Sequence, residues 1–478
     1  MRKIEIILIA AILVIGLAVR LYKIDRPVAD WHSWRQADTA AVARNFIKEG
    51  FNPFIPRYDD MSSQANGLDN PNRYRFVEFP VYNSIIAAVW SITGINDAMA
   101  RLVTVFITLG STGLLYLVVR NFSDWQTATI SAFFFAIIPY NVFYSSAILP
   151  GPLMVFFLLA LYLSFVNWLK EQKLIFALFS VLFANLAILT WPIAIFFSLP
   201  LFYLAVDRFG KDILKKPSLF IIAFLSIVPF IAWRVWMSQF PEGIPNWQFL
   251  LNEGNIRFRG AFFRWLIVER LGGLILSVTG FAVFALGVLI KPKSKEKLFY
   301  HFWLGSLLLY FIVFASGNVR HDYYQVPAIP ILAVFLAKGA GFLFKLPSEY
   351  FLQVVGKITA ILLIIFTLAF GFFEVRGFYW VNNPAIIEAG KAVDKLIPKD
   401  ATVIASYQGD AAFLYQTNRH GYPVVDRPLE QFIKEGTEYF ASIDVDDEGI
   451  KSLSAHCDVV EKTEKYVILK LFTECIGK

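Results

Sequence analysis

Charged and polar side chains are concentrated in a short segment that directly follows the first apolar run of the chain. The sequence DWHSWRQAD contains Asp30, His32, Arg35 and Asp38. A carboxylate in apolar, aromatic-rich surroundings has a raised pKa, which suits a general base that deprotonates a hydroxyl or an amine. This segment is therefore the first candidate for a catalytic site.

Both carboxylates of this segment also have a structural alternative. Residues 34–48 have helix-forming composition, so Arg35 and Asp38 share one helical face and could form an ion pair. Asp30 could cap that helix or pair with Arg26. Spacing alone does not decide between a catalytic and a structural role for either acid.

Further acids follow in the same loop, next to prolines that interrupt helices. The stretch NPFIPRYDD (52–60) contains Asp59 and Asp60, and RFVEFPVY (75–82) contains Glu78. Their aromatic neighbours favour the same raised pKa values. Asp59 and Glu78 are therefore added to the candidate catalytic carboxylates.

A second group of reactive side chains lies much later in the chain, in GNVRHDYYQVP (317–327). Arg320 and His321 can donate hydrogen bonds to phosphate oxygens. Tyr323 and Tyr324 can bind a polar headgroup or stack on a sugar ring. The structural alternative is an aromatic belt with a charged turn at a membrane surface.

These segments lie in a chain that is mostly apolar. It has 478 residues, of which 57% are hydrophobic and 17% charged, against about 25% charged residues in an average soluble protein. Apolar runs of membrane-spanning length recur through the first three-quarters, which predicts a polytopic helical membrane protein. Hydropathy and loop charge predict about eleven spans, near residues 4–20, 102–119, 125–145, 151–167, 174–189, 190–206, 219–237, 272–290, 299–316, 324–344 and 357–373.

The charges of the short loops predict the orientation. Loops rich in Lys and Arg tend to stay in the cytoplasm, and the strongest examples are 167–173, 207–218, 291–297 and 345–357. An odd number of spans then places the N-terminus inside and the C-terminus outside. The span 4–20 has the basic end of a signal peptide but no small-residue cleavage site, which indicates an uncleaved anchor.

One apolar segment, 80–94, is short for a perpendicular span. Counting it as a span would invert the side of every later loop, so it is predicted to form a helix on the outer face. The first outer loop then covers residues 21–101. A loop of this length is uncommon and is usually functional.

The segments predicted to lie outside are rich in arginine, whereas the inner loops use mostly lysine. Arginine binds phosphate and carboxylate through a planar fork, which favours an anionic headgroup such as a lipid phosphate or pyrophosphate. Arg35, His32, Arg257 and Arg259 are therefore further candidate donor-binding residues. The structural alternative is pairing with carboxylates and lipid headgroups. The arginines concerned are Arg26, Arg35, Arg44, Arg57, Arg73, Arg75, Arg101, Arg257, Arg259, Arg264, Arg270 and Arg320.

The C-terminal part, residues 382–478, is predicted to be a small α/β domain outside the membrane, distinct from a transmembrane domain over residues 1–381. Cys457 and Cys475 lie in it, and either a disulfide or two free thiols fit the sequence. The chain shows neither metal-ligand spacing nor a Gly-rich phosphate loop. The pattern predicts a helix over 385–397 and strands over 401–407, 438–444 and 466–472.

The order of these features resembles the GT-C superfamily of membrane glycosyltransferases. ARNFIKEGFNPFIP, EFPVYNSIIAAVWSITGINDAMARL and RHDYYQVPAIPILAVFLAKG are similar to its bacterial branch, related to the protein O-mannosyltransferases and the lipid A aminoarabinose transferases. The resemblance is densest over 27–105 and 316–340. It implies a GT-C-like all-α membrane domain in a bacterial inner membrane. It also implies an inverting transfer of a sugar from polyprenyl phosphate, such as undecaprenyl phosphate, to a lipid, glycan or protein acceptor.

The chain departs from the family pattern at the start of the loop helix. Many relatives have an adjacent Asp-Glu pair there, whereas this chain has WRQADTA. The resemblance implies that the essential acid is Asp30 or Asp38. It favours Asp30, because the family's base lies at the membrane surface where the first span meets the loop. His32 and His321 could bind a metal with Asp30, and since GT-C enzymes differ in metal use, a divalent cation stays open.

A transporter or flippase for an anionic lipid-linked substrate is the alternative function. It would share the arginines and the spans, but it requires charged residues along a path through the bilayer, and the predicted spans contain few, with Arg234 and Lys338 as candidates. A structural partner without activity is a third alternative. No nucleic-acid partner is expected. The sequence does not specify the sugar, the acceptor or the oligomeric state.

Overall fold

The computed structural model describes residues 2–345 and 350–476. Contacts among its residues divide the chain into two compact units, which we call the helical unit and the mixed unit. The helical unit comprises Met1–Ile24, Arg101–Arg234 and Trp247–Gly377, and the mixed unit comprises Asp25–Ala100, Val235–Asn246 and Phe378–Lys478. The C-terminal segment that was predicted to be a separate domain thus shares a unit with most of the long first loop.

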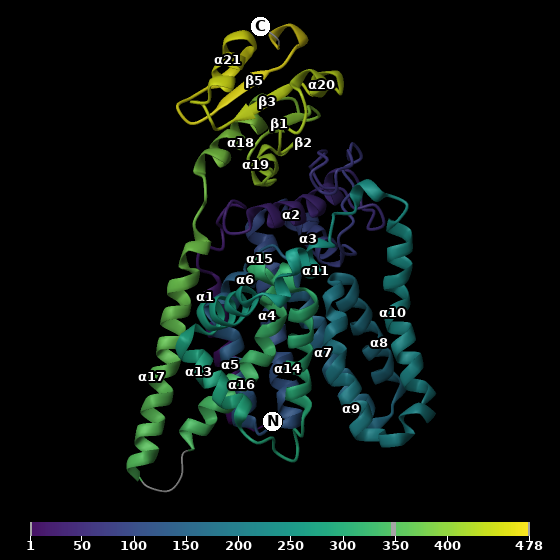
Figure 1. Cartoon of the computed structure of the whole chain (residues 1–478), viewed down its shortest axis with the longest axis vertical. Coiled ribbons are helices and arrows are strands. Elements are labelled where there is room, and N and C mark those ends of the chain that lie inside the picture. Colours follow the sequence, from purple (N-terminus) through teal and green to yellow (C-terminus); the bar gives the residue numbers. More distant parts are fainter. Residues whose placement is uncertain (1, 346–349, 477–478) are drawn as a thin grey trace. The chain divides into compact units, whose positions relative to one another are not determined.

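Long apolar helices joined by short turns make up the helical unit (Figure 1). Within the described residues, six helices are long and apolar enough to cross a membrane, or seven if a bent pair counts as one span. The helices of this unit are α1 Lys3–Arg20, α4 Asp97–Phe122, α5 Trp125–Ile137, α6 Pro139–Tyr144, α7 Gly151–Glu171, α8 Leu174–Thr190, α9 Leu199–Phe209, α10 Pro217–Met237, α11 Phe249–Asn252, α12 Gly260–Phe263, α13 Ser277–Leu289, α14 Phe299–Val313, α15 Ala315–Arg320, α16 Ile329–Phe344 and α17 Tyr350–Val375.

Every predicted span coincides with one helix or with two consecutive helical segments, which confirms the all-α class of this part. Five of the predicted spans consist of two helical segments, namely 125–145, 190–206, 272–290, 299–316 and 324–344. Pro139 ends α5, because proline has no N–H to continue the helix. A 3₁₀ turn, Pro192–Ser198, precedes α9, and the segment before α13 meets it at 109°. How many helices cross the bilayer stays a prediction, and residues 346–349 of the predicted inner loop 345–357 lie outside the described residues.

Two glycines allow α13 and α16 to pack closely. A Cβ atom on Gly287 would lie 1.9 Å from the carbonyl oxygen of Phe335, and one on Gly339 would lie 2.0 Å from that of Val283. The two backbones therefore touch, which is the usual role of small residues between membrane helices.

Two buried carboxylates inside the helical unit, those of Glu296 and Glu5, have side-chain partners. Lys338 Nζ lies 2.5 Å from Glu296 Oε1, and both side chains are buried. Tyr116 Oη donates to Glu5 Oε2. Lys338, one of the two charged residues considered for a transport path, is thus part of an ion pair.

The mixed unit combines the first loop with the C-terminal segment. The loop provides two helices that confirm the predictions for residues 34–48 and 80–94, although the position of the second on a membrane face stays a prediction. The helices and strands of this unit are α2 Ser33–Lys48, α3 Val81–Thr93, α18 Pro384–Leu396, β1 Val403–Ala405, α19 Ala412–Thr417, β2 Gly421–Tyr422, α20 Leu429–Lys434, β3 Tyr439–Ser442, α21 Glu448–His456, β4 Asp458–Lys462 and β5 Val467–Lys470.

The strands form one sheet in the order β2-β1-β3-β5-β4. β1 pairs in parallel with β2 and with β3, whereas β5 runs antiparallel to β3 and to β4. The three predicted strands correspond to β1, β3 and β5, which are mostly buried. β2 and β4 were not predicted, because β2 has only two residues and β4 is largely exposed.

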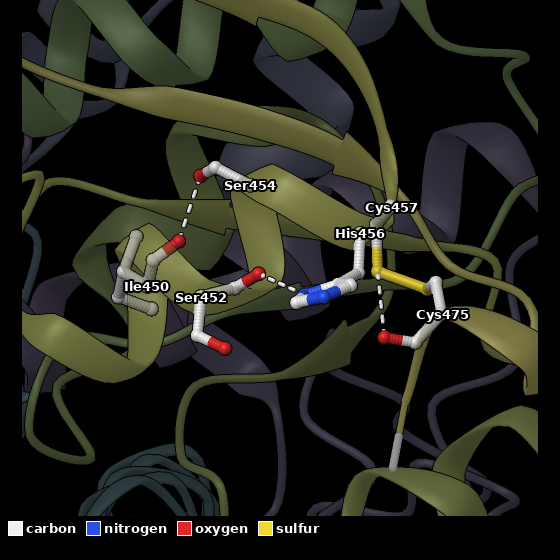
Figure 2. The surroundings of a disulfide bond; sticks show 6 residues. All are labelled: Ile450, Ser452, Ser454, His456, Cys457 and Cys475. Carbon is white, nitrogen blue, oxygen red and sulfur yellow. Dashed lines mark hydrogen bonds between the residues drawn. A yellow bond between two sulfur atoms is a disulfide. The ribbon is translucent and has the colours of Figure 1, made fainter. Parts of the chain in front are cut away.

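A disulfide joins Cys457 to Cys475 in this sheet domain (Figure 2). Cys457 follows the last turn of α21, and Cys475 lies in the 3₁₀ turn after β5. Both cysteines belong to the buried core. The disulfide, one of the two states that the sequence left open, is therefore the state of this structure.

Candidate functional site

The carboxylate of Asp30 is held by two side chains of its own unit. It accepts a hydrogen bond from Arg26 Nε at 2.5 Å and one from Gln36 Nε2 at 2.8 Å. Gln36 lies in the first turns of α2, so this bond ties the preceding loop to the helix. The Asp30 side chain is fully buried. The structural alternative of a pair with Arg26 is thus realised, and the acid at the junction of the first span and the loop is buried within the protein.

The C-terminal segment closes the same loop. The backbone N–H of Asn382 donates to the carbonyl of Ala29 at 2.9 Å, and the N–H of Trp31 donates to the carbonyl of Phe378 at 3.1 Å. The rings of Trp31 and Phe378 stack with their centroids 4.8 Å apart. The backbone on both sides of Asp30 is therefore fixed by residues that lie about 350 positions later.

Two more buried pairs join α2 to the segment before α3. Arg35 Nη2 lies 2.5 Å from Glu78 Oε1, and Arg75 Nη2 lies 2.7 Å from Asp38 Oδ2. Arg35 and Asp38, whose mutual pairing was the structural alternative, each have an ion-pair partner outside α2. The segment before α3 supplies one cation, Arg75, and one anion, Glu78. The two charged residues in the first turns of α2 therefore each have an ion-pair partner outside the helix.

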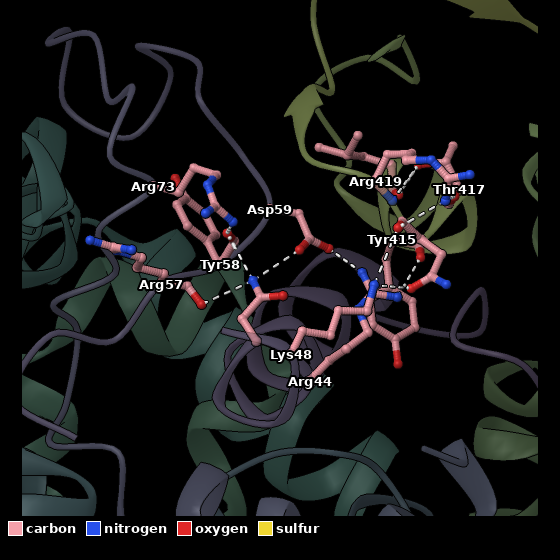
Figure 3. Close-up of polar contacts among 12 residues, drawn as sticks. Arg44, Lys48, Arg57, Tyr58, Asp59, Arg73, Tyr415, Thr417 and Arg419 are labelled. Atoms are coloured by element: carbon pink, nitrogen blue, oxygen red, sulfur yellow. Dashed lines mark hydrogen bonds and ion pairs between the residues drawn. The ribbon is translucent and has the colours of Figure 1, made fainter. Parts of the chain in front are cut away.

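Asp59 belongs to a polar cluster that links α2 to α19 (Figure 3). Arg44 Nη2 donates to Asp59 Oδ2, and Arg44 Nη1 donates to the carbonyl of Tyr415 at 3.0 Å. Asn45 Nδ2 donates to Asp59 Oδ1 at 3.1 Å. Both carboxylate oxygens of Asp59 thus have strong partners, and its contacts favour a structural role over the predicted catalytic one.

Glu78 differs from the other paired acids because only one of its oxygens has a partner. Oε1 accepts from Arg35, whereas Oε2 is buried without a hydrogen-bond partner among the residues that the structure describes. An unpartnered buried carboxylate oxygen is costly. Glu78 is therefore the candidate acid with a free acceptor atom for a bound group.

Burial changes the acidity of two carboxyl groups in this unit. It raises the pKa of Asp38, while the charges of Arg75 and Arg35 act in the opposite direction. Burial also raises the pKa of Asp60 to about 6, although hydrogen bonds from Gln64 and Ser62 lower it. The expectation that acids of this loop have raised pKa values is confirmed for these two groups.

In the helical unit, the second predicted group of residues surrounds a carboxylate that was not among the candidates. Asp322 is buried at the start of the 3₁₀ turn Asp322–Ala328. Tyr144 Oη donates to its Oδ1 at 2.5 Å, and Arg270 Nη1 lies 3.6 Å from its Oδ2. Its backbone carbonyl accepts from Tyr140 Oη at 2.5 Å. A charged residue directly before an apolar helix is the sequence signal that could have indicated it.

The candidate donor-binding residues of this region differ in how far their side chains already contact other residues of the chain. Arg320 is half-exposed, pairs with Glu253, and lies over the ring of Phe249. Tyr323 and Tyr324 are buried, with ring centroids 4.6 Å apart. These tyrosines thus pack inside the unit, and the predicted stacking on a sugar would require them to open.

Two further arginines precede this region in the same unit. Arg257 Nη2 donates to the carbonyls of Leu251 and Val313 at 3.0 and 3.2 Å. The exposed side chain of Arg259 has no ion-pair partner in residues 2–345 and 350–476. Of the two, Arg259 is therefore the cation that remains available to an anionic ligand.

The predicted residues accordingly fall into two groups. Asp30, His32, Arg35, Asp38, Asp59 and Glu78 lie in the mixed unit, whereas Arg257, Arg259, Arg320, His321, Tyr323 and Tyr324 lie in the helical unit. His32, at the start of α2, has a left-handed backbone conformation with φ 54°. Among the described residues, no group of three or more His, Cys, Asp or Glu side chains could hold a metal ion, so metal use stays open.

The arrangement of helices and the attached sheet domain defines a GT-C fold. ArnT from Cupriavidus metallidurans, in a crystal structure bound to undecaprenyl phosphate, matches with a TM-score of 0.65 over 98% of this chain and 99% of ArnT, at 13% sequence identity. AglB, the oligosaccharyltransferase from Archaeoglobus fulgidus, in complex with an inhibitory peptide and a dolichol-phosphate, matches with a TM-score of 0.55 over 98% and 76% of the two chains, at 12% identity. These similarities concern the fold.

Sequence comparison matches one part of the chain to a family model. Residues 71–236 match the family model described as dolichyl-phosphate-mannose-protein mannosyltransferase. The partial family match and the fold agree with the resemblance to GT-C enzymes and support a membrane glycosyltransferase. They give no support to the transporter alternative. No curated protein sequence matches the chain.

Asp60 allows a test of the electrostatics of the mixed unit. An Asp carboxyl titrates near pH 3.9 in an unfolded chain, and that of folded Asp60 near pH 6. Between these values the folded state binds more protons, so the free energy of unfolding falls as the pH rises from about 4 to about 6. Asp60→Asn removes this loss, which is roughly 3 kcal/mol for about two pKa units.

The measurement is hydrogen–deuterium exchange of the mixed unit in lipid nanodiscs between pH 4 and 8, corrected for intrinsic exchange. Asp60→Asn should match the wild type near pH 4 and be more stable above pH 6. Asp400→Asn changes an exposed acid of the same unit and serves as the control. An equal pH dependence for Asp60→Asn and the wild type would contradict the raised pKa.

Proposed function

We propose that the chain transfers a sugar from a polyprenyl-phosphate-linked donor to an acceptor on the outer side of a bacterial inner membrane. The family description names a dolichyl-phosphate-linked sugar. Two of the solved structures with this fold were determined with undecaprenyl phosphate and with dolichol-phosphate. These lipids share a phosphate on a long isoprenoid chain, which is the donor class that we assign here.

The reaction is a single displacement with inversion at the sugar. The acceptor oxygen or nitrogen forms a bond to the anomeric carbon, and the bond from that carbon to the phosphate oxygen breaks. The polyprenyl phosphate leaves with the bonding electrons, and a carboxylate takes the acceptor proton. Cationic side chains favour the departing phosphate because negative charge grows on it.

Asp30 is the carboxylate that we propose as the base. The observation that carries this role is the rigid position of its carboxylate, which Arg26 and Gln36 hold while paired backbone segments fix the loop around it. A base must be placed accurately before its acidity matters. Because Asp30 is buried, the acceptor has to reach it through an opening of the neighbouring side chains.

Glu78 is proposed to bind the acceptor or a cation through its second oxygen. That oxygen is buried without a partner in the described residues, so a donor group placed there removes an unfavourable state. Its other oxygen is fixed by Arg35 at 2.5 Å. Glu78 can therefore position a group without changing its own orientation.

The donor phosphate is assigned to cations of the helical unit. Arg320 is half-exposed and is neutralised by Glu253, which is itself half-exposed. Exposed ion pairs are weak, so a phosphate with more charge can replace the Glu253 carboxylate. His321 and Arg259 are the neighbouring candidates for the same ligand.

The orientation of the chain is part of the proposal. The charge of the short loops favours a cytoplasmic N-terminus and a C-terminal domain outside. The disulfide between Cys457 and Cys475 supports this, since disulfides persist in oxidising compartments. An outside mixed unit would place Asp30 on the same side as the acceptor.

The proposed activity is tested with labelled undecaprenyl-phosphate-linked sugars, presented to the purified protein in nanodiscs together with cell-envelope extract. Transfer of label to the extract supports the proposal. Movement of intact labelled lipid across a sealed vesicle, without transfer, would instead support a flippase. The same assay supplies the rates for the variants below.

Removal of the Asp30 charge should abolish most of the transfer. Asp30→Asn keeps the size of the side chain, and the rate should fall by about a hundredfold or more, the scale of general-base catalysis. It also leaves the Arg26 guanidinium buried without its counter-charge, which lowers stability by about 3–5 kcal/mol. Rates are therefore compared at equal amounts of folded protein.

Two variants separate chemistry from folding in this experiment. The double variant Arg26→Gln with Asp30→Asn removes both charges, so it should recover stability but not activity. Asp25→Asn makes the same change at an exposed acid and should leave the rate unchanged. A folded Asp30→Asn enzyme with near wild-type rate, beside an inactive Asp38→Asn, would move the role of base to Asp38.

The assignment of Arg320 predicts an effect on donor use. Arg320→Ala should weaken donor binding by about 1.5–3 kcal/mol, the value of a charge-assisted contact. Arg320→Lys should rescue it only in part, because lysine lacks the planar fork. The measurement is KM for the labelled donor, with Arg264→Ala as a control at another exposed, paired arginine. An unchanged KM in Arg320→Ala would shift the phosphate site to Arg259.

Labelling of intact cells tests the orientation. Single cysteines at Asn96 and Glu435, in a background with Cys457 and Cys475 replaced by serine, should both react with an impermeant maleimide. A cysteine at Lys173 should be protected, because the loop that contains it is predicted to lie inside. Protection of Asn96 alone would refute the outer position of α3, and protection of both sites would overturn the orientation.

A further inference from the structure

The sheet of the mixed unit has a reversal in its strand order at β1 and β3. These neighbouring strands are parallel. The chain leaves β1 through α19 to reach β2 on one side, and it leaves β3 through α21 to reach β4 on the other side. Connections that depart in opposite directions open a crevice beyond the carboxyl ends of the two strands. In open α/β sheets, ligands bind in such crevices.

A cavity of about 440 Å³ lies at this position. Tyr407, Gln408 and Asp410 follow β1, and Ile443 and Asp444 follow β3. The lining is completed by Asn383, which precedes α18. Its volume falls within the range of small-molecule sites. The cavity therefore has both the topology and the size of a binding site.

The lining side chains define the chemistry of the ligand. They include two carboxylates, two amides and a phenol ring, but no Lys, Arg or His. An anionic group such as phosphate would be repelled by the carboxylates, and no lining residue offers it a cation, although the charge of His32 acts on Asp410. Carboxylates and amides accept and donate hydrogen bonds to hydroxyl groups, and a tyrosine offers an apolar ring beside them.

The hydrogen bonds and the burial of Asp410 favour a ligand with neutral hydroxyl groups over a strongly cationic ligand. Its carboxylate already accepts from Ser33 Oγ and from the backbone N–H of Ala412, both at 2.7 Å. Burial raises the pKa of Asp410, which disfavours a second full negative charge in the cavity. Asp444 is exposed and has neither a side-chain hydrogen bond nor an ion pair to the described residues.

We infer that this cavity is a saccharide-binding site, and that it holds a hydroxyl-rich part of the acceptor. The second half of the inference rests on the proposed function. Two hydrogen bonds connect the cavity to the segment of the candidate base. Asp410 binds Ser33, three positions after Asp30, and Asn382, the neighbour of the lining residue Asn383, binds Ala29. An acceptor anchored here is therefore held by the same framework as Asp30.

The test uses the full chain in nanodiscs, probed with an array of neutral oligosaccharides and, for comparison, immobilised spermine and phosphate. Neutral saccharides should bind, and titration with a soluble hit should give its dissociation constant. Tyr407→Ala and Asp444→Asn should each weaken binding by about tenfold, the effect of one or two lost contacts. Asp446→Asn, a fully exposed acid two positions from Asp444, should bind as the wild type does.

Several results would overturn the inference: no bound saccharide, equal binding in Tyr407→Ala and Asp444→Asn as in the wild type, or capture of spermine or phosphate in place of saccharides. Release of sugar from the labelled donor is measured on the same samples. Donor turnover without saccharide binding refutes this site alone. Saccharide binding without donor turnover refutes the proposed function and the acceptor role, and it supports the saccharide site itself.

Discussion

The burial of arginine–carboxylate pairs is the interaction on which the mixed unit depends. Arg26 with Asp30, Arg35 with Glu78, Arg75 with Asp38 and Arg44 with Asp59 are all shielded from solvent. Desolvation of these charges is expensive, and it is offset only where geometry and further hydrogen bonds are good. Three of these pairs join two different segments of the loop, whereas Arg26 and Asp30 lie four positions apart in one segment. The pairs therefore specify one arrangement of a long segment with little regular secondary structure.

The same pairs change the interpretation of the arginine-rich composition. An excess of arginine was taken to indicate an anionic headgroup, because the guanidinium binds phosphate well. In the mixed unit that property serves carboxylates of the chain itself, and even Arg57 and Arg73 share Glu49. Arginine content thus cannot distinguish a ligand site from internal pairing. The cations with spare capacity, Arg320 and Arg259, are recognisable only from their exposure and partners.

Local sequence patterns predicted the helices and strands whose formation depends on local interactions. Apolar length and helix composition were enough for the long helices, for α2 and for α3, and buried strand patterns were enough for β1, β3 and β5. The ion-pair partners of Asp38 and Glu78 depend on how α2 packs against a segment about 40 residues away. Rules based on sequence spacing do not predict such packing. For the same reason the sequence does not reveal that residues about 350 positions later cover Asp30. The pairing of the cysteines and the cavity beside β1 also arise from this long-range packing.

The joint packing of loop and C-terminal segment bears on how such an enzyme can combine a fixed base with variable acceptors. In the proposed reaction the Asp30 carboxylate has to stay in place, because a base works only at hydrogen-bond distance from its proton. Acceptor recognition, in contrast, can reside in loops at the ends of strands, which tolerate change without loss of the fold. In the mixed unit, Ser33 joins these two functions, since it begins α2 and binds Asp410 in the cavity. The residues beyond β1 and β3 can therefore vary with the acceptor while the buried pairs around Asp30 remain unchanged.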